Sequence, residues 1–464
     1  MPDIERLPYV ADVARRFAVL ADEPWAAWLD SGYPEGGGRY DVCVAAPYAR
    51  LVTRGNITEL TDAEGGLVTA GERDPIDWLR DMLGETAHAG PQPFAGGALG
   101  YFGYDLGRRF ENLPRRPAPD AWPEMAVGLY DWALITDHAA RRSWIASAGR
   151  DPRGDAVWRD RLTALREPPG LPAVRRPARL GPLETNLSRA AYDQAFDRLQ
   201  RYIHDGDCYQ ANFAQRFSAR LDGRPWEAYR WLRAHSPSPF AAYLNYPFGQ
   251  VLSTSPEQFL EVNGRHVTTR PIKGTRPRGR SLAADEALAT ELRLSPKDRA
   301  ENLMIVDLLR NDLGKVCRPG SVRVPRLFAL ETFASVHHLV SEVRGELRDG
   351  VHALDLLRGC FPGGSITGAP KRRAMEIIDE LEPDRRDVYC GSIGWIGFDG
   401  AMRTNIAIRT ALWRDGQVSY WAGGGIVADS SAAAEYQETL VKAAAFFRLL
   451  GVAPDANGPM LATV

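Results

Sequence analysis

The order of strand-like and helix-like segments constrains the fold of this 464-residue chain more than any other feature. Three strand-like segments, FAAYLNY, VLSTS and EQFLEV, follow one another between residues 240 and 262, with only turn residues between them. Helical patterns then dominate residues 295–314, 370–382 and 432–450. Strands that are clustered in runs, and do not alternate strictly with helices, predict a mixed α+β fold.

The density of these patterns divides the chain into three parts. Residues 1–150 mix helical and strand signals and form a predicted N-terminal domain. Residues 151–186 are rich in proline and arginine, which interrupts regular structure and predicts a linker or a long surface connection. Residues 187–450 carry the densest helix and strand patterns and form a predicted second domain.

Composition excludes several classes of protein. The net charge of −2 argues against a nucleic-acid or anionic-membrane binder, because both require a basic surface. No apolar run approaches the roughly 18 residues of a membrane span, and the start MPDIERLPYV lacks the apolar core of a secretory signal. Five scattered cysteines without a CxxC pair predict neither disulfides nor a zinc site, so we expect a cytoplasmic protein.

Two pairs of carboxylates recur with a spacing of three residues on predicted helices. Asp298 pairs with Glu301, and Glu435 pairs with Glu438. Residues three apart share one helical face, so two such helices could place four carboxylates around a hard cation such as Mg²⁺. The spacing also permits a structural interpretation, in which Ser295 begins a capping box and the second pair lies on a solvated face.

A lysine in the segment RPIKGTRPRG is a candidate nucleophile. Lys273 lies between Pro271 and Pro277, and Gly274 after it permits an unusual backbone angle. An amine attacks only when neutral, so its pKa must fall below the ordinary value of about 10.4. Glu257 precedes a predicted hairpin with an Asn-Gly turn, which could bring an acid beside this amine. A basic surface turn and an unremarkable glutamate remain the alternative.

Two glycine-rich segments could bind an anion. FPGGSITGAPKRRAME precedes a helix that begins near Pro370, and WAGGGIVADS offers a second turn rich in N–H groups. Arg409 lies among apolar residues, where an unpaired charge is costly. Together these features indicate a ligand with more than one carboxylate, although each glycine cluster alone is also compatible with close packing.

Two adjacent histidines, His337 and His338, lie in the predicted strand FASVHHLVSEV. Successive side chains of a strand point to opposite faces, so at most one of them is expected to face a site. A structural role remains the alternative for either histidine.

These segments together resemble the chorismate-utilising enzymes, which include anthranilate synthase component 1, aminodeoxychorismate synthase component 1, isochorismate synthase and salicylate synthase. The resemblance covers nearly the whole chain and is densest between residues 192 and 443. The motifs that carry it are, in chain order, YQANFAQRF, STSPEQF, PIKGTRPRG, SPKDRAENLMIVDLLRND, HHLVSEV, GGSITGAPKRRAMEIIDELE, YCGSIGWIG, IRT and GGGIVADSSAAAEYQET.

Two positions sharpen the resemblance within the family. Lys273 stands in PIKGT, which is similar to aminodeoxychorismate synthases component 1, whereas anthranilate synthases have a small residue there. Gln210 stands where isochorismate and salicylate synthases carry a lysine base. The alternatives are anthranilate formation, a chorismate amination for a specialised metabolite, and a non-enzymatic regulatory subunit that binds tryptophan.

The resemblance implies a fold and an activity. It implies two antiparallel β-sheets packed as a sandwich with helices outside, and a chorismate-binding catalytic domain over residues 187–450. Lys273 would attack C2 of chorismate, Glu257 would protonate the departing C4 hydroxyl, and ammonia would give 4-amino-4-deoxychorismate for p-aminobenzoate and folate synthesis. Because the chain carries no glutaminase sequence, ammonia would come from solution or from a separate glutamine amidotransferase subunit.

The resemblance also implies a set of site residues. Glu301 and Glu438 would hold Mg²⁺, with Asp298 and Glu435 nearby through water. His338 would lie near the leaving hydroxyl. The residues that would line the chorismate pocket or hold its carboxylates are Gln210, Gly274, Thr275, Tyr389, Arg409, Gly423, Gly424, Gly425 and Lys442. A tryptophan site in the N-terminal region would include Leu29, Ser31 and Arg39.

Overall fold

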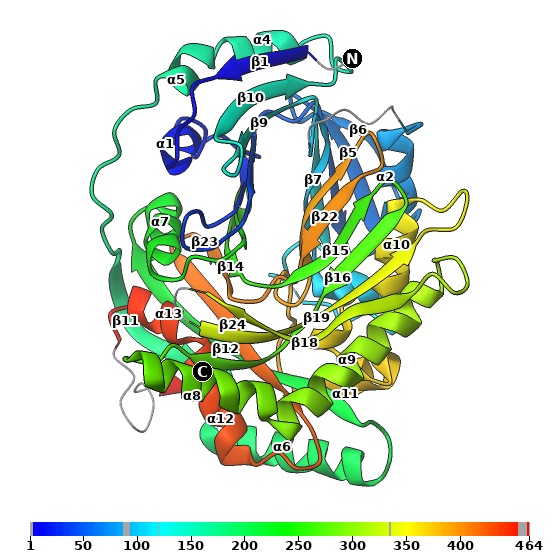
Figure 1. Cartoon of the computed structure of the whole chain (residues 1–464). Helices are drawn as coiled ribbons and strands as arrows, with labels where there is room; N and C mark the ends of the chain where they lie inside the picture. The colour runs from blue at the N-terminus through cyan, green and yellow to red at the C-terminus, as the bar shows by residue number, and fades with distance from the viewer. Residues whose placement is uncertain (1–2, 87–92, 119, 334–335, 453–461, 464) are drawn as a thin grey trace.

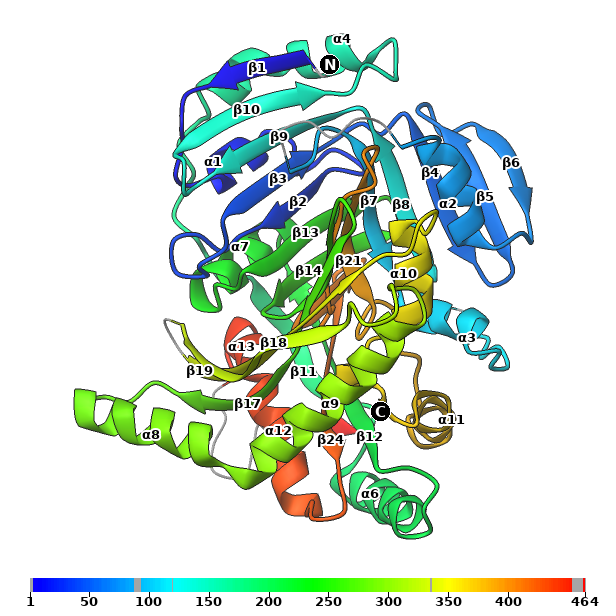
Figure 2. The same ribbon diagram turned by 45° about the vertical axis from the view of Figure 1, so that its right-hand side comes forward.

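The computed structural model describes residues 3–86, 93–118, 120–333, 336–452 and 462–463. Its strands form two large sheets that face each other across the molecule, with most helices on the outside (Figures 1 and 2). This architecture confirms the expected α+β sandwich.

The first sheet contains 13 strands within the described residues. Its strands are, in spatial order, β1 (Asp3–Leu7), β10 (Arg142–Ser147), β9 (Trp132–Asp137), β3 (Tyr40–Val44), β2 (Ala27–Asp30), β13 (Phe240–Tyr246), β14 (Gly249–Ser255), β23 (Thr410–Arg414), β24 (Gln417–Ile426), β12 (Gln210–Asp222), β11 (Ala178–Thr185) and β25 (Ala462–Thr463), with β20 (Gly368–Ala369) paired to β12. Neighbouring strands pair antiparallel, except that β11 and β25 run parallel.

The second sheet contains 12 strands within the same described ranges, and its neighbouring strands pair antiparallel. They are, in spatial order, β17 (Ile272–Pro277), β19 (Val336–Glu346), β16 (His266–Arg270), β15 (Gln258–Asn263), β22 (Met402–Asn405), β21 (Ser392–Gly397), β7 (Gly97–Phe102), β8 (Met125–Tyr130), β4 (Ala49–Arg54), β5 (Ile57–Asp62) and β6 (Leu67–Gly71), with β18 (Arg323–Thr332) paired to β19.

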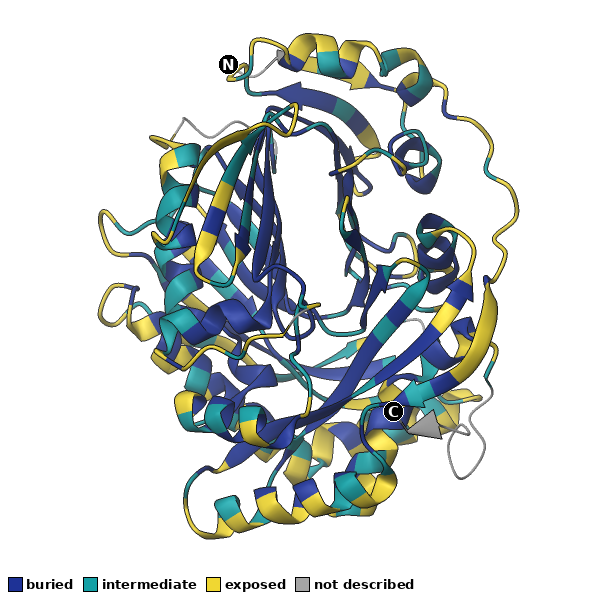
Figure 3. Ribbon diagram, turned by 180° about the vertical axis from the view of Figure 1, so that it is seen from behind, coloured by how far each residue is buried: buried dark blue, intermediate teal, exposed yellow. Residues whose placement is uncertain are grey.

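The helices lie around these sheets. The α-helices are α1 (Ala14–Phe17), α2 (Pro75–Leu83), α3 (Gly107–Phe110), α4 (Gly154–Arg159), α5 (Leu162–Arg166), α6 (Arg189–His204), α7 (Pro225–His235), α8 (Leu282–Leu294), α9 (Pro296–Gly314), α10 (Ala353–Cys360), α11 (Lys371–Leu381), α12 (Ala432–Lys442) and α13 (Ala444–Leu449). Two 3₁₀ turns, η1 (Tyr104–Leu106) and η2 (Gly364–Ile366), complete the set. Exposed residues gather on the outward helices and loops, while the facing strands are buried (Figure 3).

Strand alternation builds two cores from the first sheet. In β14, Val251 points into the core between the sheets, and Leu252 points into the core beneath the helices. The same alternation separates Leu412 from Trp413 in β23. Because successive side chains face opposite ways and both faces are covered, these strands are apolar on both sides. The sandwich is therefore a layered structure with helices closing the outer face of the first sheet.

Several local predictions are confirmed. The Asn-Gly segment forms a tight hairpin in which Asn263 pairs with His266 between β15 and β16. Pro370 is the cap residue of α11. The Ser295 hydroxyl caps α9 by accepting a hydrogen bond from the backbone N–H of Asp298 at 3.2 Å. The Ser295 cap is thus confirmed, but the solvated face expected for the second carboxylate pair is wrong for Glu435, which is buried.

The first 150 residues and the later part of the chain share both sheets. β2 pairs with β13 in the first sheet, and β7 pairs with β21 in the second. The segment 151–186, expected as a linker, contains the short helices α4 and α5 and ends with strand β11. The boundaries at 150 and 186 stay a prediction, and the strand pairing shows that residues on either side of them fold together.

Two expectations about composition can be compared with the structure. All five cysteines lie within the described part of the chain, where they are buried and unpaired. Of the helices in the described ranges, none combines the length and the apolar character that crossing a membrane requires.

Candidate functional site

Lys273 and Glu257 meet at the 3₁₀ turn η2. The Lys273 Nζ atom, on β17, donates a hydrogen bond to the backbone oxygen of Ser365 at 3.2 Å. The side chain of Ser365 hydrogen-bonds the Glu257 carboxyl, which also accepts from the backbone N–H of Ile272. The hairpin and the turn therefore bring the amine and the acid together. We call Lys273, Glu257 and Ser365 the lysine site.

Burial shifts the pKa values of this pair in opposite directions. It raises the pKa of Glu257 to about 7, against the opposing effects of Ser365 and Lys273. It lowers the pKa of Lys273, although the nearby Glu301 and Glu257 partly oppose the shift. Desolvation disfavours the charged form of either group, so a buried acid holds its proton longer and a buried amine loses it sooner. The lysine site is thus electrostatically suited to hold a proton donor beside a nucleophile.

Helices α9 and α12 bring three of the predicted carboxylates close together. The Nζ atom of Lys297 lies 4.0 Å from Glu301 and 3.8 Å from Glu435, so it connects the two helices. Glu438, one turn farther along α12, pairs with Lys442 at 2.7 Å. Burial raises the pKa values of both Glu301 and Glu435, and Glu438 adds to each shift.

The donor chemistry of these carboxylates fits a hard cation. A Cβ atom at Gly424 would lie only 2.9 Å from a Glu435 oxygen and 3.1 Å from a Glu438 oxygen, so the glycine leaves the two carboxylates room to converge. Carboxylate oxygens are the ligands that Mg²⁺ takes in proteins. Within the described ranges, however, no three His, Cys, Asp or Glu side chains form a ready-made metal cluster.

Asp298 has a different environment from the other three carboxylates. It pairs with Arg276 of β17 at 3.1 Å. Its side chain also packs against Gly274, where an added Cβ atom would lie 3.0 Å from it. Gly274 has a φ of +86°, a conformation that a side chain strains, so this residue fits both the backbone turn and the contact.

The two adjacent histidines face opposite ways, as predicted. His338 Nδ1 lies 2.8 Å from the Thr275 hydroxyl on the neighbouring strand. Burial lowers the pKa of His338 to about 3, and the charge of Arg409 contributes to the shift. His337 instead contacts Thr332 and Asp285, away from this cluster. His338 is therefore a neutral imidazole near an arginine.

Within the described residues, Arg409 lacks an ion-pair partner and Gln210 lacks a hydrogen-bond partner. Burial lowers the pKa of Arg409, and no carboxylate in the described part of the chain forms an ion pair with it. Gln210 is fully buried, and neither atom of its amide makes a hydrogen bond. Buried polar groups are nearly always satisfied, so each exception needs an explanation, and a bound molecule that supplies the missing partner is one.

The glycine run Gly423–Gly425 on β24 serves packing and the site together. A side chain at Gly423 would collide with the backbone oxygen of Phe213 on β12 at 2.4 Å. The carbonyl of Gly423 accepts from Lys442 Nζ at 2.8 Å. A Cβ atom at Gly425 would meet the amide of Gln210 at 2.6 Å. Close packing is thus a correct interpretation of these glycines, and they also border the carboxylates and the unpaired amide.

Not every predicted site residue joins this arrangement. Tyr389 is buried in the core between the sheets, where its ring stacks on Trp421 at 6.2 Å and lies 5.9 Å from the Arg386 guanidinium. Sequence reasoning missed Ser365, which contacts both Lys273 and Glu257. Its position inside the glycine-rich motif FPGGSITGAP was the available signal, but only the glycines of that motif were considered.

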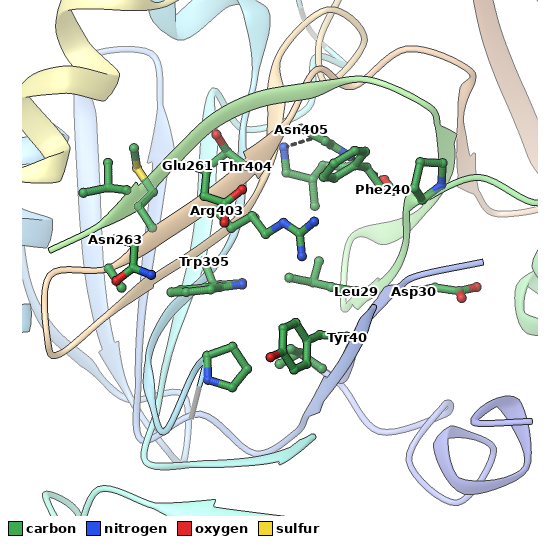
Figure 4. A pocket seen from close by; sticks show the side chains of 18 of the residues that line it. Leu29, Asp30, Tyr40, Phe240, Glu261, Asn263, Trp395, Arg403, Thr404 and Asn405 are labelled. Carbon is green, nitrogen blue, oxygen red and sulfur yellow. Dashed lines mark hydrogen bonds between the residues drawn. The ribbon is translucent and has the colours of Figure 1, made fainter. Parts of the chain in front are cut away.

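A cavity separate from the lysine site lies between the two sheets. Its volume is about 270 Å³. Figure 4 shows Leu29, Phe240 and Trp395 around it, with Arg403 among them. The Arg403 guanidinium lies 5.0 Å from the centre of the Phe240 ring. We call it the inter-sheet cavity.

Of the three residues expected in a tryptophan site, only Leu29 lines the inter-sheet cavity. The backbone N–H of Ser31 donates to Asp41 at 2.7 Å. Arg39 pairs with Asp137 at 2.8 Å. These two residues therefore belong to neighbouring polar contacts and not to the cavity wall.

Known proteins resemble this chain in sequence and in fold. The sequence pattern described as chorismate binding enzyme matches residues 27–448. Aminodeoxychorismate synthase component 1 of Klebsiella aerogenes is 49% identical, over 95% of this chain and 97% of the relative. Anthranilate synthase component 1 of Streptomyces coelicolor is 45% identical, over 80% of this chain and 76% of the relative.

A solved structure with a similar fold is anthranilate synthase component I from Streptococcus pneumoniae. It superposes with a TM-score of 0.77 at 32% identity, over 88% of this chain and 92% of that chain. The fold, the sequence pattern and the full-length relatives therefore point to one family.

Proposed function

This chain belongs to the chorismate binding enzyme family, and we propose that it is the family member that aminates chorismate at C4. The product is 4-amino-4-deoxychorismate, a precursor of p-aminobenzoate and folate, and the reaction class is that of a transferase. The proposal is supported by relatives such as the Klebsiella aerogenes aminodeoxychorismate synthase component 1, which shares 49% identity across nearly the whole chain.

The observation that carries the proposal is the pairing of Lys273 and Glu257 at Ser365, with pKa shifts of opposite sign. In the proposed reaction the neutral Lys273 amine attacks C2 of chorismate, both ring double bonds shift by one position, and the C4 hydroxyl leaves. Protonated Glu257 supplies the proton with which that hydroxyl departs as water. Ammonia then adds at C4, both double bonds shift back, and the Lys273 amine leaves from C2. Covalent catalysis replaces one difficult substitution with two easier ones.

The residues that remain without partners are suited to hold the two carboxylates of chorismate. Arg409 supplies a buried cation that no carboxylate of the described chain neutralises. The amide of Gln210 on β12 and the backbone of Gly423–Gly425 on the paired strand β24 supply further polar groups. The neutral imidazole of His338, held by Thr275, is available as a hydrogen-bonding partner for the leaving hydroxyl.

Glu301, Glu435 and Glu438 are the residues that would hold Mg²⁺. When bound, Mg²⁺ offsets the negative charge of the substrate's ring carboxylate. In the structure Lys297 and Lys442 pair with these same carboxylates and partly neutralise them. We assign Asp298 a supporting role, because Arg276 already engages its carboxylate and it holds β17 next to Lys273.

The proposed reaction needs ammonia, and the relatives are named component 1, which implies a second subunit. We therefore propose that a separate glutamine amidotransferase subunit, a component 2, supplies ammonia to this chain in the cytoplasm.

We also propose that the inter-sheet cavity binds tryptophan, because its volume of about 270 Å³ and its wall of Leu29, Phe240 and Trp395 suit an indole ring.

Anthranilate synthesis is the second candidate, because a relative with that activity in its name shares 45% identity over 80% of this chain. One experiment separates the two. The purified protein is incubated with chorismate, ammonium and Mg²⁺, and the product is analysed by mass spectrometry. We expect 4-amino-4-deoxychorismate, which retains the enolpyruvyl group. Anthranilate with released pyruvate would refute the proposal in favour of the second candidate.

A further inference from the structure

A cavity of about 220 Å³, distinct from the inter-sheet cavity, opens beside α3 and the turn between β4 and β5. Its lining is rich in arginine and includes only two carboxylates, Asp105 and Glu124. The arginines are Arg108, Arg109, Arg115, Arg116 and Arg385. We call it the arginine cavity.

Both carboxylates of the arginine cavity are already occupied. Asp105 pairs with Arg108 at 3.0 Å and with Arg385 at 3.3 Å. Glu124 pairs with Arg385 at 3.0 Å and accepts a backbone hydrogen bond from Gly55 at 2.8 Å. Asp105 and Glu124 therefore pair with Arg108 and Arg385 on the inner wall and do not pair with the arginines at the outer side of the cavity.

The arginines at the outer side of the cavity include Arg109 and Arg115, which carry unpaired positive charge within the described residues. Arg109 donates to the backbone oxygen of Gly55, and Arg115 lies against the same glycine. Neither guanidinium pairs with a carboxylate in the described ranges of the chain. Arg116 donates to the backbone oxygens of Glu382 and Pro383, and its guanidinium also lies 4.0 Å from the Asp379 carboxylate, so only Arg109 and Arg115 count as unpaired here. An anion at this place would therefore meet at least two unneutralised guanidinium groups.

The size of the arginine cavity and its setting define the class of anion. Guanidinium groups match carboxylates in a planar, two-pronged geometry. A volume of about 220 Å³ accommodates one acidic side chain. The whole chain carries a net charge of −2, so the basic character is local and does not form the extended surface that a nucleic acid needs. An aspartate or glutamate presented by another protein fits these conditions.

The arginine cavity is also connected to the lysine site. Arg385 of its wall is followed in sequence by Arg386, which is buried and pairs with Glu382 at 2.6 Å. Arg386 also donates to the backbone oxygen of Ile366 at 2.8 Å. Ile366 follows Ser365, the residue that contacts Lys273 and Glu257. A protein bound at the arginine cavity would thus sit behind the turn that positions the nucleophile and the acid.

We propose that the arginine cavity is the docking site for the glutamine amidotransferase subunit, and that it receives an acidic side chain of that subunit. The inference rests on the proposed function, which requires an ammonia-supplying partner. It assigns the position of that partner to α3, the segment after it, and the turn between β4 and β5.

The test uses the double variant Arg109→Glu/Arg115→Glu and the glutamine amidotransferase subunit of the same organism. Amination is measured twice, with glutamine at increasing concentrations of the subunit and with ammonium alone. Reversal of two charges should raise the half-saturating subunit concentration by about tenfold or more, because like charges across an interface repel. The rate with ammonium alone should stay within about twofold, since neither arginine contacts the lysine site. Subunit binding is also measured by calorimetry, which does not depend on turnover.

Arg142→Glu is the matched control, because Arg142 is an exposed arginine on β10, in the outer part of the first sheet. It should leave both measurements unchanged. Unaltered binding of the double variant would overturn the proposal, and so would an equal loss with ammonium in a variant that melts like the wild type. If the wild-type protein binds the subunit but forms no aminated product, the proposed function is refuted while the docking proposal still stands.

Discussion

The lysine site and the inter-sheet cavity both use strands of the second sheet, but they bury very different chemistry. At the lysine site burial shifts the pKa values of Lys273 and Glu257, and the neighbouring His338 is shifted as well. The inter-sheet cavity combines apolar side chains such as Leu29 and Phe240 with the charged groups Asp30, Asp399 and Arg403, and burial shifts the pKa values of these three groups as well. Burying ionisable groups is costly at both places, but of the two only the lysine site places an amine and an acid on one shared contact, Ser365, so we expect the chemistry there.

This contrast teaches how one sandwich can separate reaction from recognition. The lysine site gathers its groups from β17, from the residue before β15, and from η2, so three chain segments must be placed correctly. The inter-sheet cavity needs only a shape and a few polar groups between two packed layers. Substitutions at the first should therefore change rate, and substitutions at the second should change binding with little effect on rate.

The largest expected effect is that of Lys273→Ala. Loss of the covalent nucleophile should reduce amination by at least about 10⁴-fold, the scale on which such losses act. The fold should survive, because Lys273 lies on the edge strand β17 and, within the described residues, its amine donates only to Ser365. The rate is measured with chorismate, ammonium and Mg²⁺, and the fold by circular dichroism. Lys315→Ala, at a half-exposed lysine paired with Asp312, is the control and should stay near wild type.

Turnover of Lys273→Ala at the wild-type rate would remove the nucleophile role. Partial recovery by an added small primary amine would instead strengthen it, because the amine replaces the deleted group.

Glu257→Gln should have the next largest effect, a loss of about 10²- to 10³-fold, because general acid catalysis contributes on that scale. Burial raises the pKa of Glu257 to about 7, so the proton that the reaction needs is present below that pH and is lost above it. The wild-type rate should therefore fall as the pH rises through 7 at a constant concentration of free ammonia. The rate of the Glu257→Gln variant should not show this fall as the pH rises through 7. A wild-type rate that is flat between pH 6 and pH 9 would assign the proton to another group.

Glu438→Gln should act on the metal requirement. We expect the half-saturating Mg²⁺ concentration to rise by about 10- to 100-fold, while the rate at saturating Mg²⁺ recovers in part. Asp298→Asn is the comparison, since Arg276 holds that carboxylate and it faces Gly274. It should shift the Mg²⁺ titration less than Glu438→Gln does. Equal shifts in the two variants would show that Asp298 belongs to the metal ligands after all.

The class of the fold was within reach of the sequence, but the pairing of its strands was not. Runs of strand-like segments indicate antiparallel sheets, and the Asn263 hairpin could be placed from its turn residues alone. The pairing of β2 with β13 joins residues about two hundred positions apart. Because strands such as β14 are buried on both faces, periodicity does not say which layer they join.

The candidate site shows the same limit at the level of single residues. The approach of Lys273 to Glu257 follows from one short hairpin, so local reasoning could predict it. Ser365 joins them from a turn far along the chain, and nothing in its local sequence shows that contact. Asp298 shares a helical face with Glu301, but Arg276 of the neighbouring strand pairs with it, and only the tertiary structure shows that partner.

The smallest effect on catalysis, and the sharpest test of the contrast, is expected from Phe240→Ala in the inter-sheet cavity. The ring of Phe240 forms part of the wall and lies under the guanidinium of Arg403. Its removal should weaken tryptophan binding by about tenfold, in line with the loss of one aromatic contact, while the amination rate without tryptophan stays within about twofold. Calorimetry with tryptophan and the ammonium assay measure the two quantities. If the rate fell as far as the affinity, the two regions would be coupled, and the separation of chemistry from recognition would be wrong.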